Sequence, residues 1–179
     1  MAKGKGKGSQ WERDVSKYLT NWLTNQKSEY YFWRSPGSGS VATISGTNPS
    51  LHGDIIPLKP EAEKICSKLI FECKNGYPST SLDNHLKNNK NDPLKSFWLQ
   101  VYKQAYNECS KYPILIYKKK GYKDPWVGIN SVLHRMLYYH LSEMKYVCLY
   151  WEDEQLDLIL FNMKQFFDNI TPQIIEEKL

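Results

Sequence analysis

The chain has 179 residues, of which 41% are apolar, enough to build the core of a single domain. Its formal net charge is +5, and residues 152–179 hold seven acidic side chains against two lysines, so the rest of the chain carries +10. A basic body with an acidic end indicates a polyanionic partner, although a solvated lysine-rich surface gives the same composition. No apolar run has the length of a membrane span.

The cysteine pattern argues against a zinc site and against a disulfide framework. The four cysteines lie far apart, without a CxxC pair, and no signal peptide precedes them. They are Cys66, Cys73, Cys109 and Cys148. We therefore expect reduced thiols in a cytoplasmic protein.

The first eight residues, MAKGKGKG, alternate lysine and glycine and cannot pack. They predict a flexible basic arm (1–8) before one domain (9–179). The lysines at positions 3, 5 and 7 (Lys3, Lys5, Lys7) are candidates for sequence-independent phosphate contacts. A solubilising end is the alternative.

A helix is predicted from Ser9 to about residue 23, because apolar residues recur there at helical spacing, as at Trp11, Val15 and Leu19. Ser9 as N-cap and Glu12 three residues later would form a capping box. An aromatic strand, residues 30–34, then leads into the glycine- and serine-rich stretch 35–40. Such a loop allows close approach of the backbone to a phosphate, although a generic loop has the same composition.

Two strands joined by a loop, residues 54–58 and 68–74, hold the candidate chemistry. Side chains alternate along a strand, so Glu72 and Lys74 point to one side and Cys73 to the other. If the first strand brings Asp54 to the same edge, two carboxylates meet one lysine, which suits Mg²⁺ and an activated water. Lys74 would orient or deprotonate that water, or offset charge on the phosphate. Edge-strand charges facing water are the competing interpretation.

The remaining elements follow from turn signals and periodicity. After a polar excursion over residues 76–91, Asp92 and Pro93 predict the start of a helix that ends near residue 111. The expected elements beyond it are strands 113–117 and 126–129, a helix 131–144, a hairpin of strands 146–151 and 156–161, and a helical acidic end.

Asp54, followed eighteen positions later by Glu72-Cys73-Lys74, resembles the motif of the PD-(D/E)XK nuclease superfamily. Gly53 stands where the nominal pattern has proline. The strings KGSQWER and RSPGSGS are similar to the first helix and the serine loop of archaeal Holliday junction resolvases and related phage nucleases. The resemblance covers roughly residues 5–120.

This resemblance implies an α/β fold with a restriction-endonuclease-like core, a central mixed β-sheet flanked by helices. It implies a Mg²⁺ cofactor, with Mn²⁺ as a substitute. The implied catalytic residues are Glu12, Asp54, Glu72 and Lys74, and the implied metal ligands are Glu12, Asp54, Glu72 and the Cys73 carbonyl. The implied nucleic-acid contacts are Arg34, Ser38 or Ser40, and Gln100, beside the three N-terminal lysines. His52 could also touch DNA, and the basic run 118–120 suits the rim of a DNA groove, although both suit plain solvent exposure.

The resulting expectation is a nuclease domain that hydrolyses DNA phosphodiester bonds as a Holliday junction resolvase. It would act as a homodimer on four-way junctions in a prokaryotic or phage-infected cell. Another enzyme of the superfamily (restriction-like, nickase or flap nuclease) is the first alternative. A non-catalytic DNA-binding protein on the same fold is the second.

Overall fold

The structure is a computed structural model that describes residues 5–25, 29–35, 52–77, 82, 85 and 92–179. Within them, the centre is a five-stranded sheet with the order β3-β4-β5-β7-β6. Strands β3 and β4 are parallel and the other neighbours are antiparallel. The strands are β3 (Leu69–Asn75), β4 (Tyr112–Lys118), β5 (Trp126–Ile129), β6 (Tyr146–Trp151) and β7 (Leu156–Asn162).

The parallel pair β3 and β4 is connected by a helix that crosses one face of the sheet. Helix α5 (Pro93–Lys103) begins as predicted, because the Asp92 side chain accepts a hydrogen bond from the Leu94 amide and Pro93 occupies the first turn. The prediction of one helix to residue 111 is wrong in its last part. The chain continues as a π-helix, η2 (Gln104–Cys109), and ends at Ser110 in a left-handed conformation.

A separate two-stranded sheet lies beside the main one. Strand β1 (Phe32–Arg34) pairs antiparallel with β2 (Ile55–Pro57), so β2 does not join β3 as a neighbouring strand. The predicted loop between β2 and β3 is also wrong, because it contains helix α3 (Pro60–Cys66). Ala62 and Ile65 of α3 are fully buried and hold it against the core.

Helix α1 (Lys5–Thr24) begins four residues earlier than predicted. Ser9 therefore lies inside the helix, the predicted capping box is wrong, and residues 5–8 belong to the helix and not to an arm. The predicted apolar side is confirmed, since Trp11, Val15 and Leu19 are buried. At its other end, the Thr20 hydroxyl accepts hydrogen bonds from the amides of residues 31 and 32 and so ties β1 to α1.

The C-terminal third completes the sheet and covers it. The predicted hairpin is confirmed, with a 3₁₀ turn, η3 (Glu152–Glu154), between β6 and β7. The predicted helix 131–144 is instead two short helices, α6 (Ser131–Met136) and α7 (Tyr138–Leu141). The acidic end forms α8 (Met163–Asn169) and α9 (Pro172–Lys178).

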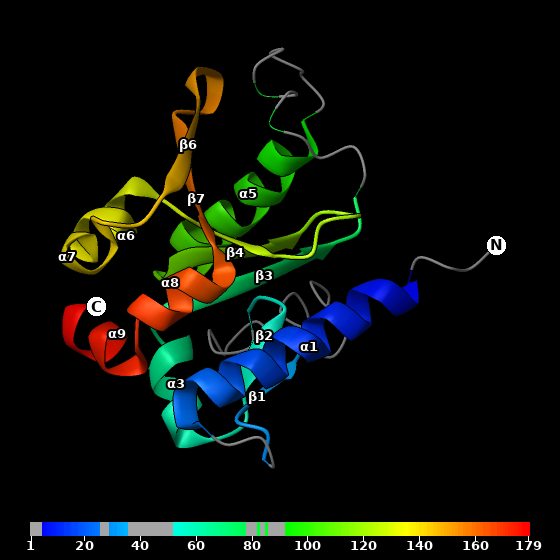
Figure 1. Cartoon of the computed structure of the whole chain (residues 1–179), viewed down its shortest axis with the longest axis vertical. Coiled ribbons are helices and arrows are strands. Elements are labelled where there is room, and N and C mark those ends of the chain that lie inside the picture. The colour runs from blue at the N-terminus through cyan, green and yellow to red at the C-terminus, as the bar shows by residue number, and fades with distance from the viewer. Residues whose placement is uncertain (1–4, 26–28, 36–51, 78–81, 83–84, 86–91) are drawn as a thin grey trace.

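The helices cover both faces of the sheet (Figure 1). One core lies between the sheet and helices α1, α3, α6, α7, α8 and α9. The second core lies under α5, where Trp98 belongs to the same buried cluster as Ile70, Leu115 and Leu160. This arrangement confirms an α/β fold with a mixed sheet flanked by helices. None of the described helices has an apolar stretch long enough to cross a membrane.

Candidate active site

Asp54 is held against β3 by main-chain hydrogen bonds, although it lies outside the five-stranded sheet. The Asp54 amide donates to the Phe71 carbonyl at 2.8 Å, and the Cys73 amide donates to Oδ2 of Asp54 at 2.8 Å. On its other side, the Ser35 amide donates to the Asp54 carbonyl at 2.8 Å. Asp54 is 5% exposed. The carboxylate is thus fixed beside the part of β3 that contains Glu72 and Lys74.

Gly53 explains the departure from the nominal motif. Its φ is +86°, a left-handed value that proline cannot adopt. A Cβ at this position would lie 2.8 Å from the Phe71 carbonyl oxygen and 2.9 Å from Cγ1 of Ile70. Glycine therefore lets the chain approach β3 closely enough for Asp54 to reach the Cys73 amide.

Glu72 and Lys74 lie on the same side of β3, as predicted, and form an ion pair between Nζ and Oε1. Gln100 of α5 donates from Nε2 to the same Glu72 oxygen at 3.1 Å. Nζ of Lys74 also lies 5.4 Å from the centroid of the Phe97 ring, another residue of α5. Glu72 is 2% exposed, so these two donors hold a buried carboxylate.

Glu12 approaches the same region from α1. It is 9% exposed, and its Oε2 accepts a hydrogen bond from Nη1 of Arg34 at 3.3 Å. Arg34 was predicted to contact phosphate; in this structure it pairs with Glu12. One guanidinium therefore lies between α1 and β1, next to the acidic cluster.

The three carboxylates all have raised pKa values, chiefly because they are buried. Burial, followed by the Asp54 charge, raises the pKa of Glu72 to about 7, against the opposing effect of Lys74. Burial raises the pKa of Asp54 despite the Cys73 amide and Lys74, and burial together with Asp54 raises that of Glu12. Burial opposes the charge of Lys74, but the carboxylates of Glu72 and Asp54 outweigh it and raise its pKa.

The donor set fits a hard divalent cation. Carboxylate oxygens are the ligands that Mg²⁺ prefers, and an added positive charge would offset the cost of burying Asp54 and Glu72. Among the described residues, no group of three or more His, Cys, Asp or Glu side chains is arranged so that it could hold a metal ion by itself. Mg²⁺ is commonly held by one or two carboxylates together with water and substrate phosphates, so the Asp54 and Glu72 pair meets that requirement.

Several predicted site residues lie elsewhere or outside the description. Lys3, Ser38 and Ser40 are outside the described residues, and for Lys5 and Lys7 the structure describes only the main chain, in the first turn of α1. The Cys73 thiol is buried in the core, and the Cys73 amide is the group that contacts Asp54.

Two contacts near the site were not predicted. Nε2 of Gln104, the first residue of the π-helix, lies 3.2 Å from Nδ1 of His52. Nζ of Lys118 lies 5.5 Å from the centroid of the Trp11 ring. Sequence spacing gives no signal for either contact, because each joins residues that are more than fifty positions apart.

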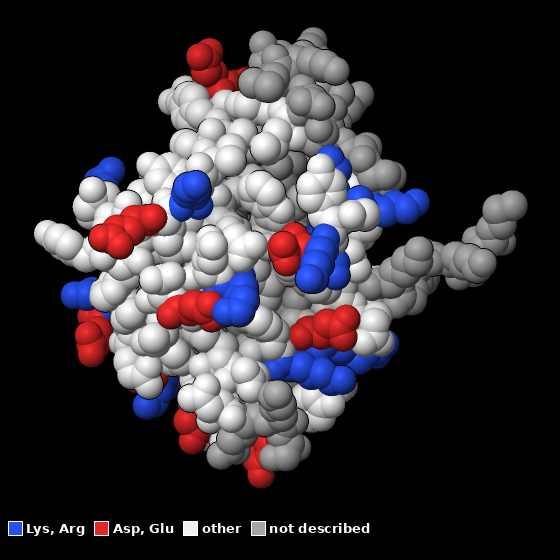
Figure 2. Space-filling model, in the orientation of Figure 1, with Lys and Arg blue, Asp and Glu red and all other residues white. Residues whose placement is uncertain are grey.

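One face of the molecule carries charged side chains of both signs. Figure 2 shows acidic and basic side chains lying next to one another on the face in view. Charge on this face therefore does not by itself mark a binding surface for a polyanion.

A comparison with protein families returns one described as a phage putative PDDEXK endonuclease, whose model matches residues 3–177. A search of curated proteins finds no match, and neither does a search of solved structures. The match spans both the site and the C-terminal third, which the sequence motifs alone did not reach.

Proposed function

Because the chain belongs to the phage putative PDDEXK endonuclease family, we propose that it is a Mg²⁺-dependent endonuclease that hydrolyses DNA phosphodiester bonds at the Asp54, Glu72 and Lys74 cluster. The resemblance to the PD-(D/E)XK superfamily is confirmed by that membership. The closeness to Holliday junction resolvases stays a prediction.

The observation that supports these roles most strongly is the convergence of two buried carboxylates and one lysine at the end of β3. Asp54 and Glu72, together with the Cys73 backbone carbonyl, are the residues that would hold the cation. Glu12 would add negative charge from α1. Bound there, Mg²⁺ would supply Lewis-acid activation and charge neutralisation at the phosphate.

Lys74 acts as a donor in this proposal. Its raised pKa keeps the ammonium protonated at neutral pH, which favours offsetting charge on the phosphate oxygens over deprotonating water. Gln100 is a positioning residue, since its amide holds the same Glu72 oxygen that Lys74 contacts. Arg34, which pairs with Glu12 at the border of the cluster, would meet a phosphate of the bound strand.

We further propose a branched DNA substrate and a two-fold homodimer. The support is the similarity of KGSQWER and RSPGSGS to segments of Holliday junction resolvases, enzymes that cut two strands symmetrically. Mn²⁺ is expected to replace Mg²⁺, since it prefers the same oxygen ligands.

The test is a cleavage assay with Mg²⁺ on a labelled four-way junction, a matched linear duplex and a single strand, using wild type and Glu72→Ala. Paired symmetric cuts confined to the junction, and lost in the variant, are the expected result. Variant-sensitive cleavage of linear duplex would retain the nuclease and reject the junction. Binding without cleavage of any substrate would favour a non-catalytic DNA-binding protein.

A further inference from the structure

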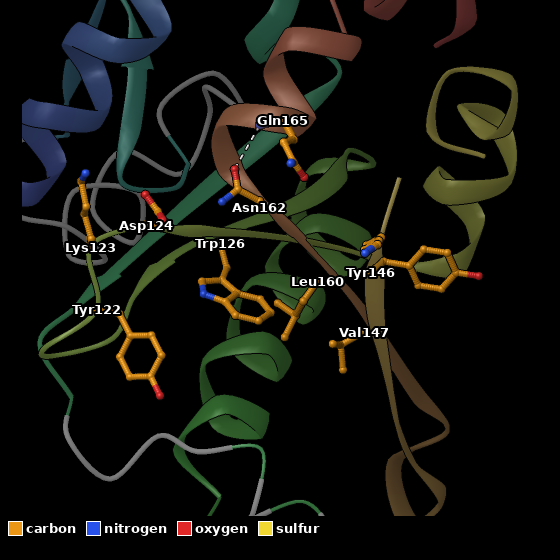
Figure 3. A pocket seen from close by; sticks show the side chains of 10 residues that line it. Tyr122, Lys123, Asp124, Trp126, Tyr146, Val147, Leu160, Asn162 and Gln165 are labelled. Carbon is orange, nitrogen blue, oxygen red and sulfur yellow. Dashed lines mark hydrogen bonds between the residues drawn. The ribbon is translucent and has the colours of Figure 1, made fainter. Parts of the chain in front are cut away.

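An aromatic pocket lies at the start of β5, away from the acidic cluster. It is open to solvent and has a volume of about 370 Å³. Figure 3 shows the rings of Tyr122 and Trp126 on one side of β5 with Leu160 and Val147. The Tyr146 ring points away from these residues in Figure 3 and packs instead 5.6 Å from Phe161. The pocket therefore presents two aromatic side chains, of which Tyr122 is 52% exposed.

Sheet register places this pocket level with the candidate active site. Lys74 of β3 pairs with Tyr117 of β4, and Tyr117 pairs with Trp126 of β5. Paired residues of neighbouring strands project to the same face. Trp126 packs against the core under α5, the face to which Lys74 also points. Two strand spacings, about 10 Å, separate the backbones of Lys74 and Trp126.

The turn between β4 and β5 is rich in lysine and brings one ammonium group close to the Tyr122 ring, whereas Figure 3 shows Lys123 on the opposite side of the chain from this ring. Residues 118–123 include four lysines and no acid, with Asp124 following. Nζ of Lys119 lies 4.8 Å from the centroid of the Tyr122 ring, and the Tyr122 amide donates to the Lys119 carbonyl at 3.2 Å. Gly121, with φ +86°, allows this turn. An exposed ring and its neighbouring ammonium group thus stand together at the active-site end of the sheet.

We propose that this pocket binds an unpaired nucleotide of the DNA strand, with its base against Tyr122 and Trp126 and a phosphate against Lys119. Aromatic side chains beside a basic groove are the usual means of binding single-stranded nucleic acid, because every base has a face that can stack. The inference rests on the proposed DNA endonuclease function and names a part of the substrate that would be bound two strands away from Lys74.

An unpaired nucleotide fits the pocket better than a duplex. A base in a duplex is stacked between its neighbours and shows only its edges in the grooves. The pocket offers ring faces from a concave surface, so a base must leave its stack to reach them. Unpaired bases occur at branch points and at strand ends, and a site of this kind would favour such substrates over linear duplex.

The test is fluorescence anisotropy of the full chain with a labelled oligo-dT strand and with a blunt-ended linear duplex of similar length, both in EDTA to prevent cleavage. Tyr122→Ala should weaken oligo-dT binding about tenfold, the loss of one stacked base, whereas Tyr122→Phe should bind within about twofold of wild type. Tyr139→Ala is the matched control, since Tyr139 is 90% exposed on α7, and it should not change binding. Lys119→Ala should reduce the salt dependence of binding, whereas Lys17→Ala on α1 should not.

Three results would overturn the proposal: no binding of oligo-dT by wild type, equal binding by Tyr122→Ala, or an equal effect of Tyr122→Ala on the blunt-ended duplex. The last result would indicate a duplex-binding surface. The two proposals fail separately. If wild type cleaves DNA but Tyr122→Ala leaves oligo-dT binding unchanged, only the pocket proposal fails. If Tyr122→Ala weakens oligo-dT binding but no substrate is cleaved, only the nuclease proposal fails.

Discussion

The Cys73 amide donates a hydrogen bond of 2.8 Å to Oδ2 of Asp54, and this contact joins a residue outside the five-stranded sheet to the end of β3. The acid is positioned by the main chain of β3, since β2 pairs with β1 instead. The geometry of the cluster therefore depends on how closely the chain before Asp54 approaches β3.

Replacing Gly53 tests that dependence. Gly53→Ala should lower the free energy of unfolding by roughly 1–3 kcal/mol, because alanine adds both left-handed strain and a collision with the Phe71 carbonyl. Displacement of Asp54 should slow cleavage by more than about tenfold. Thermal or denaturant unfolding and cleavage rates measure the two effects.

Gly121→Ala is the matched control for stability. Gly121 has the same φ of +86°, but a Cβ there would meet nothing within 4 Å, so it isolates strain from collision. Equal destabilisation by the two substitutions would show that the close approach at Gly53 is unimportant.

Lys74→Ala should lower the cleavage rate by on the order of a hundredfold or more, because the donor nearest the Glu72 carboxylate is lost. DNA binding measured in EDTA should stay near that of wild type, since one phosphate contact among many is removed. Lys17→Ala serves as the control for a change of charge alone. A large loss of binding with an unchanged cleavage rate per bound complex would contradict the assigned role.

The raised pKa of Glu72 predicts a pH dependence of stability in the protein treated with chelator. A carboxyl group whose pKa is higher in the folded state than in the unfolded state binds its proton more tightly when the protein is folded. Its contribution to stability is therefore fully present below pH 4.5, the ordinary pKa of glutamate, and is lost as the pH rises toward about 7. Relative to Glu72→Gln, wild type should therefore lose roughly 3 kcal/mol of unfolding free energy between these pH values. Urea unfolding across this range measures the difference, and a constant difference would show that burial does not perturb this carboxyl group.

Gln100→Ala should slow cleavage by roughly 10- to 100-fold with little change in DNA affinity, because it frees the Glu72 carboxylate from one of its two donors. Lys103→Ala, an exposed change on the same helix, is the control. A positioning role predicts that Gln100→Ala alters the Mg²⁺ concentration needed for half-maximal rate. If affinity for DNA fell while the rate at saturation did not, Gln100 would instead be a DNA contact.

Elements with strong local signals could be predicted from the sequence. Strands β3, β4, β6 and β7 are apolar runs bounded by turn residues, and Asp92 with Pro93 marks the start of α5. The pairing of Glu72 with Lys74 followed from strand alternation alone. Local sequence carries enough information for these features because neighbours along the chain determine them.

Other features depend on contacts between distant residues. The Ser9 capping box was a sound local pattern, yet α1 begins at Lys5. The pairing of β2 with β1, and not with β3, has no local signature, because strand partners are chosen by tertiary packing. The Gln100 contact with Glu72 depends on how α5 crosses β3. Glycine is needed at position 53 because the Phe71 carbonyl leaves no room for a Cβ there.

The most direct measurement for the central claim is the DNA cleavage rate with Mg²⁺, with EDTA, and after Mg²⁺ is restored, for wild type, Asp54→Asn and Asp14→Asn. Asp14 is an exposed acid on α1 and controls for the loss of one negative charge. Cleavage by wild type and by Asp14→Asn should stop in EDTA and return with Mg²⁺, and Asp54→Asn should cleave more slowly by on the order of a hundredfold or more. Cleavage that persists in EDTA, or that Asp54→Asn performs as fast as wild type, would contradict the central claim.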